Sequence, residues 1–514
     1  MSLSSKPSVS DLQRPRDVQP DVPSAPRALA SESYVERALP GILSTRDLTF
    51  MFIIILFFIT NVGNAAAGGP AGLALWVIGG ILFFIPCCIA SAQLGVLFPH
   101  EGSIYDWTHR ASGRFMSFFV GFVAWVPGPL LILATAELVV NLLQGLNATW
   151  LVEPWQQGLA LLGIIIFSCV VAIQRHRTAQ NMVNIVVPLI LLATALVAVS
   201  GLVWVLHKQP SATDFGQVAS WNPFTAANLP LFGVITLGYL GVNLPLNMGG
   251  ELASPRGRSQ RRAITGHLLW GSLIVLGCYL LSTLGVLVVE GQNASFVLSA
   301  PITTVDMALG PIAGGITAVC IMATLVVATI AYNYVFARFL LVGGIDQRIP
   351  VRWGKLNRNR IPANAIVLQT CVACALAVLF FMVIPYVGVL AGPPAHLAAS
   401  FYFVLVGTAT VLWAFATIFL FVNLLVLLSR QGRVLRDHQL FPSWILLLSS
   451  GIGLLAGLAA IVDTILNSYD PPDIPNGTWW YLVTGLTVLV LFVGLIGGML
   501  ASSEANWQGM ESSE

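Results

Sequence analysis

The stretch that decides the fold is residues 229–255, LPLFGVITLGYLGVNLPLNMGGELASP. It is long and apolar enough to cross a bilayer, yet Gly238, Gly241, Asn243 and Pro245 lie in its middle. A helix broken at membrane depth leaves backbone groups unpaired, so it persists only where it faces protein or a watery cavity. The sequence therefore predicts a broken membrane helix with a ligand site at the break. Close helix packing is the alternative explanation for each single glycine.

The composition places the whole chain in a membrane. Of its 514 residues, 56% are hydrophobic and 9% are charged, as is typical of a multi-pass membrane protein. Hydropathy predicts twelve spans, near residues 48–68, 72–97, 116–143, 157–174, 182–206, 229–251, 265–289, 311–342, 363–384, 398–428, 441–463 and 478–501. The predicted fold class is thus an all-α polytopic membrane protein with twelve transmembrane helices.

The positive charges between the spans lie almost entirely on one side. If the N-terminus is inside, the cytoplasmic loops hold Arg110, Arg114, Arg175, Arg177, Arg256, Arg258, Arg261, Arg262, Arg348, Arg352, Lys355, Arg358, Arg360, Arg430, Arg433 and Arg436. The opposite loops hold Lys208 alone. Because cytoplasmic loops carry an excess of Lys and Arg, this asymmetry predicts that both termini are cytoplasmic. The expected location is a plasma membrane or a cell inner membrane.

The first span carries a second break. After the apolar run MFIIILFFI come Thr60, Asn61, Gly63 and Asn64, where a regular membrane helix would carry apolar residues. The two breaks lie five spans apart. This spacing is expected if spans 1–5 and 6–10 are inverted repeats that each begin with a discontinuous helix.

Several motifs together resemble the amino acid–polyamine–organocation (APC) transporter superfamily, nearest to its glutamate/γ-aminobutyrate antiporter branch. The motifs are GGILFFIP at residues 79–86, EGSIYDW at 101–107, GYLGVN at 238–243 followed by GELASPR at 250–256, and Ala337-Arg338 with Asp346 and Pro350. The resemblance implies a LeuT-like fold of two five-helix repeats. It also implies secondary transport by alternating access. Asn243 stands where many amine-handling members carry Glu, so recognition of polyamines through that carboxylate does not carry over.

This resemblance divides the chain into four predicted parts. Residues 1–46 are rich in Pro, Ser, Asp and Arg without an apolar run, and predict a disordered cytoplasmic tail. Residues 47–430 predict a ten-helix transport core, with repeats at about 47–206 and 229–428. Residues 431–503 predict two peripheral helices, a possible homodimer contact by analogy, and residues 504–514 a cytoplasmic tail.

The breaks and the resemblance together select the candidate site residues. The substrate-binding candidates are Thr60, Asn61, Gly63, Asn64, Gly238, Tyr239, Gly241 and Asn243. Glu137, an acid well inside a span, is the candidate for coupling to protons or for pairing with a substrate amine; snorkelling or hydrogen bonding as a neutral acid is the alternative. Gate candidates near the cytoplasmic side are Glu101, Glu251, Tyr332, Asn333, Arg338 and Asp346, with solvated interface charges and ordinary interfacial aromatics as the alternative.

Other function classes lack their signatures. The seven cysteines lie inside predicted spans and the seven histidines are scattered, so we expect no metal, no cofactor and no disulfide framework. No nucleophile–base constellation and no P-loop is visible, so we expect neither an enzyme nor direct use of ATP. The expected partners are a small amino acid or amine substrate and the lipid bilayer, without nucleic acid.

The sequence leaves the transport mode open. The preferred hypothesis is an antiporter of amino acids or related small zwitterions. Proton- or sodium-coupled symport and polyamine or amine exchange are alternatives. A channel or nutrient sensor on the same fold is the alternative from a different class.

Overall fold

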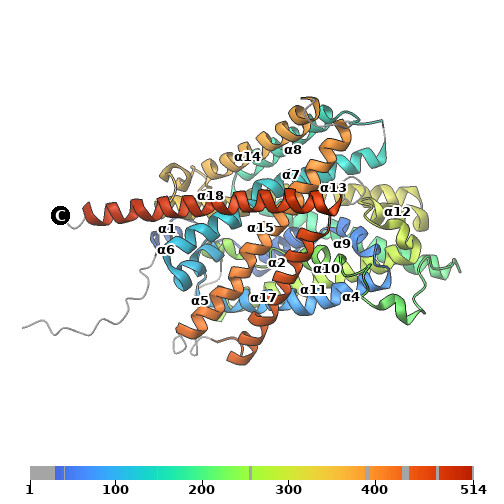
Figure 1. Ribbon diagram of the computed structural model, residues 1–514, viewed down its shortest axis with the longest axis horizontal. Coiled ribbons are helices and arrows are strands. Elements are labelled where there is room, and N and C mark those ends of the chain that lie inside the picture. The colour runs from blue at the N-terminus through green and yellow to red at the C-terminus, as the bar shows by residue number, and fades with distance from the viewer. Residues whose placement is uncertain are drawn as a thin grey trace, which may run out of the picture.

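The computed structural model describes residues 29–39, 41–147, 149–253, 258–387, 394–430, 439–469 and 474–511. Figure 1 shows its long helices gathered into one bundle, with α18 lying across the side that faces the viewer. Within the described ranges the chain forms no strand, and two isolated backbone bridges join Leu43 to Leu252 and Glu101 to Met248. The protein is therefore all-α, as the sequence predicts.

Ten helices in these ranges are long and apolar enough to span a membrane. They are built from α4 (Pro70–Gly79) continued by α5 (Ile85–Leu97), α6 (Ser103–Trp125) continued by α7 (Pro127–Leu146), α8 (Pro154–Ala172), α9 (His176–Leu206), α11 (Arg258–Val289), α13 (Pro311–Ile345), α14 (Ala363–Ala377), α15 (Pro394–Arg430), α17 (Ser443–Leu466) and α18 (Asn476–Glu511). A short helix, α12 (Ala300–Leu309), precedes α13. These ten correspond to all of the twelve predicted spans except the first and the sixth.

The first and sixth spans are the two that the sequence predicts to be broken. The first consists of α2 (Thr45–Leu56) and a second piece, residues Ile59–Ala66, bent away from it by 41°. The sixth is a series of short pieces, α10 (Leu231–Thr236), η5 (Leu237–Tyr239), η6 (Leu244–Asn247) and η7 (Gly249–Glu251). The predicted breaks are confirmed at both places.

Gly241 explains why the sixth span breaks where it does. Its φ of +106° lies in a region that residues with a Cβ rarely adopt. A Cβ at this position would also come within 2.8 Å of Trp413 Cζ2 and 2.9 Å of Ile55 Cγ2. The glycine thus lets the chain turn and lets Trp413 of α15 pack directly against the break.

Helix packing follows the pattern expected of two equivalent five-helix repeats. In the first repeat α9 packs against α13 of the second, and in the second repeat α15 packs against α6 and α7 of the first. Likewise α8 packs against α13, and α14 against α7. Each of these contacts therefore has a counterpart with the two repeats exchanged, which supports the predicted repeat organisation.

The predicted disordered tail is wrong for its last part. Residues Ala30–Ala38 form a helix, α1, and its Val35, together with Leu39 directly after the helix, packs against Leu341 of α13. The Ser31 N–H and hydroxyl both donate to the Asp346 carboxylate, at 2.9 and 3.0 Å. Two apolar residues spaced by one helical turn are enough to dock a short helix on a larger body, although they form no apolar run. Residues 1–28 of the predicted tail lie outside the described residues.

The two C-terminal helices differ in how they contact the core. α18 packs against α6 and α15, while α17 packs against α15, α5 and also α10 of the broken sixth span. The Asp463 carboxylate of α17 accepts a hydrogen bond from the Gly233 N–H at 2.6 Å. α17 thus also contacts the broken sixth span, which could not be predicted because hydropathy identifies a span without showing its neighbours. α18 continues to Glu511 and so includes most of the predicted C-terminal tail.

Candidate substrate site

The two broken spans face a shared cavity of about 320 Å³. Its walls come from both breaks, from α7, α13 and α15, and from two connecting segments: Ile55, Leu56, Phe58, Thr60, Asn61, Asn64, Leu131, Ala134, Thr135, Leu138, Val234, Leu237, Gly238, Leu240, Phe296, Leu298, Tyr332, Tyr402, Phe403, Val406, Thr410, Trp413 and Tyr469. Cavities of this size and apolar character are typical small-molecule sites.

The first break consists of extended backbone at Phe57 and Phe58, between two helical segments. α2 ends at Leu56, both phenylalanines have β-region dihedral angles, and helical structure resumes at Ile59. The last carbonyls of a helix and the first N–H groups of the next have no partner within the helices themselves. Such groups therefore meet at this break, and either side chains or a ligand must satisfy them.

Tyrosine hydroxyls satisfy part of the first break. Tyr332 of α13 donates to the Ile55 carbonyl oxygen at 2.8 Å. Tyr279 of α11 donates to the Leu56 carbonyl oxygen at 2.8 Å and accepts from the Phe58 N–H at 3.2 Å. The break therefore has a defined shape in the absence of any ligand.

Tyr279 also connects the first break to the second. Its hydroxyl lies 3.3 Å from the carbonyl oxygen of Gly238 in the sixth span. Its ring stacks on Trp76 with centroids 3.9 Å apart, and the Trp76 indole N–H donates to Thr283 at 3.1 Å. Sequence reasoning missed Tyr279, although a tyrosine inside an otherwise apolar span is itself a signal, because its buried hydroxyl needs a partner.

Four of the eight predicted binding residues line the cavity: Thr60, Asn61, Asn64 and Gly238. All but Gly238 come from the first break, where the chain re-enters helical structure. Their carboxamides and hydroxyl provide both donors and acceptors. The structure thus brings the polar residues of the first break to the same cavity as the sixth span.

The other four predicted binding residues are absent from the cavity wall, so the structure corrects their expected place. Gly63 packs on the backbone of Val297, and its carbonyl accepts from the Phe296 N–H at 3.0 Å. Tyr239 points away and donates to the Trp76 carbonyl oxygen at 3.0 Å. Gly241 lies against Trp413, while Asn243 is buried and donates to Ser103 at 3.4 Å. Proximity to a break in sequence does not decide which side of the chain faces the cavity.

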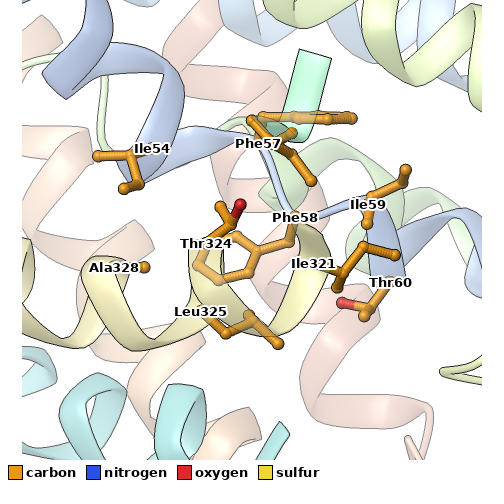
Figure 2. A pocket seen from close by; sticks show the side chains of 10 residues that line it. Ile54, Phe57, Phe58, Ile59, Thr60, Ile321, Thr324, Leu325 and Ala328 are labelled. Carbon is orange, nitrogen blue, oxygen red and sulfur yellow. The ribbon is translucent and has the colours of Figure 1, made fainter. Parts of the chain in front are cut away.

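A second, much smaller cavity of about 10 Å³ lies between the first break, α9 and α13. Figure 2 shows Phe58 lying over α13 beside Thr324 and Leu325, with Thr60 further along the break. The Thr324 hydroxyl donates to the Cys320 carbonyl oxygen of its own helix at 2.7 Å. This space is about the size of one water molecule and is walled mainly by apolar side chains.

Glu137 lies in α7 behind the cavity wall. It is 4% exposed and is not among the lining residues, although Ala134 and Leu138 of the same helix are. Asn141 donates to its Oε1 at 3.4 Å, and its Oε2 has no hydrogen-bond partner among the described residues. A buried acid next to a cavity remains a candidate for proton coupling.

Three of the predicted gate residues form one buried cluster. Arg338 of α13 contacts Glu101, with Nε 3.1 Å from Oε1, and donates from Nη2 to Glu251 Oε1. His176 of α9 adds its Nδ1 at 2.6 Å from Glu251 Oε2, and the Tyr334 hydroxyl contacts Arg338 and His176. The cluster thus ties α13 and α9 to the end of the sixth span and to the segment before α6.

The other three gate candidates lie outside this cluster. Tyr332 lines the cavity. Asn333 donates to Ser168 at 3.1 Å and Thr370 at 3.0 Å, and so holds α8 and α14 against α13. Asp346 accepts hydrogen bonds from Ser31 of α1. On one long helix, neighbouring polar residues point in different directions and serve different contacts.

Burial raises the pKa of the Glu101 carboxyl well above its usual range. The negative charge of Glu251 raises this pKa further, and the Arg338 guanidinium lowers it in part. A buried carboxyl that shares one cation with a second carboxylate is harder to ionise than one in water. The cluster therefore favours a proton on Glu101.

An all-α bundle with two broken spans around a central cavity defines the class of multi-pass membrane transport proteins. Residues 43–493 match the family described as "Amino acid permease", so the chain belongs to the amino acid permease family within the APC superfamily. It is an integral membrane transporter with a small-molecule substrate. The family and its relatives are transporters, so the expectation that the protein is not an enzyme is confirmed.

The sequence is similar to three curated transporters. An uncharacterised transporter of Legionella pneumophila is 22% identical over 356 residues, covering 66% of this chain and 74% of that protein. A probable agmatine/putrescine antiporter of Lactococcus lactis is 23% identical, covering 50% of this chain and 54% of the relative. A serine/threonine exchanger of Bacillus subtilis is 27% identical, covering 54% and 64%. The matches span less than two thirds of the latter two proteins.

Proposed function

We propose that this permease is an antiporter that exchanges amino acids or similar small zwitterions across the membrane by alternating access. The observation that carries the proposal is the cavity between the two breaks. Leu56 and Gly238 line this cavity close to where helical segments of the two broken spans end, and Thr60 and Asn61 line it where helical structure resumes in the first span. Carbonyl dipoles favour an ammonium and helix N-termini favour a carboxylate. An α-amino acid carries both groups on one carbon.

Two further observations support the proposal. The relatives named antiporter and exchanger are similar over about half of this chain. In addition, Arg338, Glu101 and Glu251 form a buried cluster near the arginine-rich loops, on the side that we propose to be cytoplasmic. We assign this cluster the role of an inner gate that is closed in the structure. Alternating access requires such contacts to form and break once in each cycle.

The proposal is tested by counterflow in proteoliposomes. A panel of labelled amino acids and amines is added outside vesicles that contain either buffer or the same unlabelled panel. Exchange predicts that internal unlabelled substrate accelerates entry severalfold. Entry that ignores internal solute but follows a proton or sodium gradient contradicts exchange, and a flux that does not saturate favours a channel.

A proton-coupled symporter is the second candidate mode, and the buried carboxyl of Glu137 favours it. In that mode Glu137→Gln removes the stimulation of uptake by an acidic outer solution while substrate binding persists. Asn141→Asp is unsuitable as a control, because Asn141 contacts Glu137. The control is therefore Gln156→Glu, at a partly exposed position at the start of α8. Unchanged pH dependence in Glu137→Gln excludes this residue from coupling.

A further inference from the structure

The side chains of the cavity identify the chemical class of its substrate. Among the described residues that line it, none is Asp, Glu, Lys, Arg or His. Seven are aromatic: Phe58, Phe296, Tyr332, Tyr402, Phe403, Trp413 and Tyr469. Most of the others are aliphatic. A substrate side chain in this cavity therefore meets a largely apolar surface without a countercharge.

Three polar groups of the cavity wall are already engaged within the protein. Thr410 donates to the Val406 carbonyl oxygen at 2.8 Å. Thr135 donates to the Leu131 carbonyl oxygen at 2.8 Å and lies 2.9 Å from the Thr329 hydroxyl. The Tyr332 hydroxyl donates to the Ile55 carbonyl oxygen. The wall formed by α7 and α15 is therefore largely apolar, and its other polar groups are the Tyr402 hydroxyl and the Trp413 indole N–H.

The polar side chains left for a ligand gather at the first break. Thr60, Asn61 and Asn64 lie on consecutive turns of the segment that resumes there. These side chains lie on the segment whose backbone we propose to bind the α-amino and α-carboxyl groups of the substrate. The cavity is thus divided into a polar end at the first break and an apolar wall opposite.

We propose that the exchanged substrate is an α-amino acid with an uncharged, apolar side chain, either branched aliphatic or aromatic. This inference rests on the proposed transport function. Moving a charged side chain from water to an apolar wall without a partner is strongly unfavourable, whereas a buried hydrocarbon side chain gains from leaving water. The volume of about 320 Å³ admits side chains as large as those of aromatic amino acids. The apolar character of the wall therefore discriminates among amino acid side chains more strongly than the volume of the cavity does.

Competition in proteoliposomes tests this class. Leucine, isoleucine, valine, phenylalanine and tryptophan should compete for counterflow about tenfold or more better than glycine, as the burial of a hydrocarbon side chain implies. Glutamate, arginine, lysine, agmatine and putrescine should compete no better than glycine. If a charged or hydroxyl-bearing solute exchanges best, the substrate class is wrong while the transport function stands. If no member of the panel exchanges, the proposed function itself fails.

A polar substitution in the wall provides a second test. Val406→Asn places a carboxamide among the lining residues, and a bond to its own helix cannot satisfy all of its donors and its acceptor. The preference for leucine over asparagine, measured as the ratio of their competition for counterflow, should fall severalfold. Val199→Asn, on the exposed side of α9, is the matched control and should leave this ratio unchanged. A ratio that is equal in Val406→Asn and wild type would show that the α15 wall does not contact the substrate side chain.

Discussion

The hydroxyl of Tyr279 donates to the carbonyl oxygen of Leu56 over 2.8 Å, at the point where the first span breaks. The same hydroxyl accepts from the Phe58 N–H and lies 3.3 Å from the Gly238 carbonyl oxygen of the other broken span. One side chain on α11 thereby contacts both breaks. The shape of the cavity depends on it.

Tyr279→Phe removes this hydroxyl while retaining the ring that stacks on Trp76. We expect a loss of about 1–3 kcal/mol in the free energy of unfolding, because buried backbone groups lose their partner. We also expect a higher KM for exchange, because the break becomes less ordered. Thermal unfolding in detergent and exchange kinetics measure the two effects. Tyr481→Phe, at an exposed tyrosine of α18, is the control and should change neither quantity.

Arg338 is fully buried and is the cation shared by Glu101 and Glu251. Arg338→Gln removes the guanidinium that contacts both Glu101 and Glu251. We expect a loss of about 3–5 kcal/mol in stability, the usual consequence of removing one partner of a buried ion pair. Arg358→Gln replaces an exposed arginine and should have little effect on unfolding. Equal stability of the two variants would contradict the role of the cluster.

The raised pKa of Glu101 predicts a pH dependence with a definite sign. A carboxyl with a raised pKa binds its proton more tightly in the folded, closed state than when solvated. Stability is therefore lost as the pH rises from the ordinary value of 4.5 toward the raised value. Arg338 and Glu251 act directly on this carboxyl, and His176 and Tyr334 contact Glu251 in turn.

Glu101→Gln tests this sign directly. The difference in thermal stability between Glu101→Gln and wild type should grow in favour of the variant as the pH rises above about 4.5. A constant difference across that range would show that Glu101 stays ionised in the folded protein. Glu153→Gln, which replaces an exposed carboxyl before α8, is the control.

Gly241→Ala should disrupt the break of the sixth span. The added Cβ would meet Trp413 at 2.8 Å, and the φ of +106° disfavours any residue with a side chain. We expect a loss of at least about 1–3 kcal/mol in stability, together with weaker exchange. Gly163→Ala in α8 is the matched control, because nothing lies within 4 Å of its added Cβ. Normal exchange by Gly241→Ala would show that this turn does not shape the site.

The positions of the two breaks could be predicted from the sequence because glycine, asparagine and proline act locally on a helix. Gly241 is both a sequence signal and the residue at which the chain turns. Glu101, Glu251 and Arg338 could be named as gate candidates from the sequence, but their mutual contacts and their burial appear only in the structure. Local composition thus predicts where a membrane helix fails.

The walls of the cavity could not be predicted in the same way. Trp413 and Tyr402 lie more than 150 residues after the second break and look like ordinary apolar residues of α15. Whether such a residue faces lipid, core or cavity depends on how α15 packs against α6 and α7. The docking of α1 depended likewise on a surface of α13 that sequence periodicity does not describe.

Competition by incomplete substrates most directly tests the claim that an amino acid is held between the two breaks. The amino acid that exchanges fastest is compared with its decarboxylated amine and its deaminated acid, as inhibitors of its own counterflow. The account predicts that the complete amino acid inhibits at least about tenfold better than either analogue, because each analogue leaves one set of broken-helix groups unpaired. Equal inhibition by either analogue would contradict the account, since the substrate would then be recognised without one of the two groups that the breaks are proposed to bind.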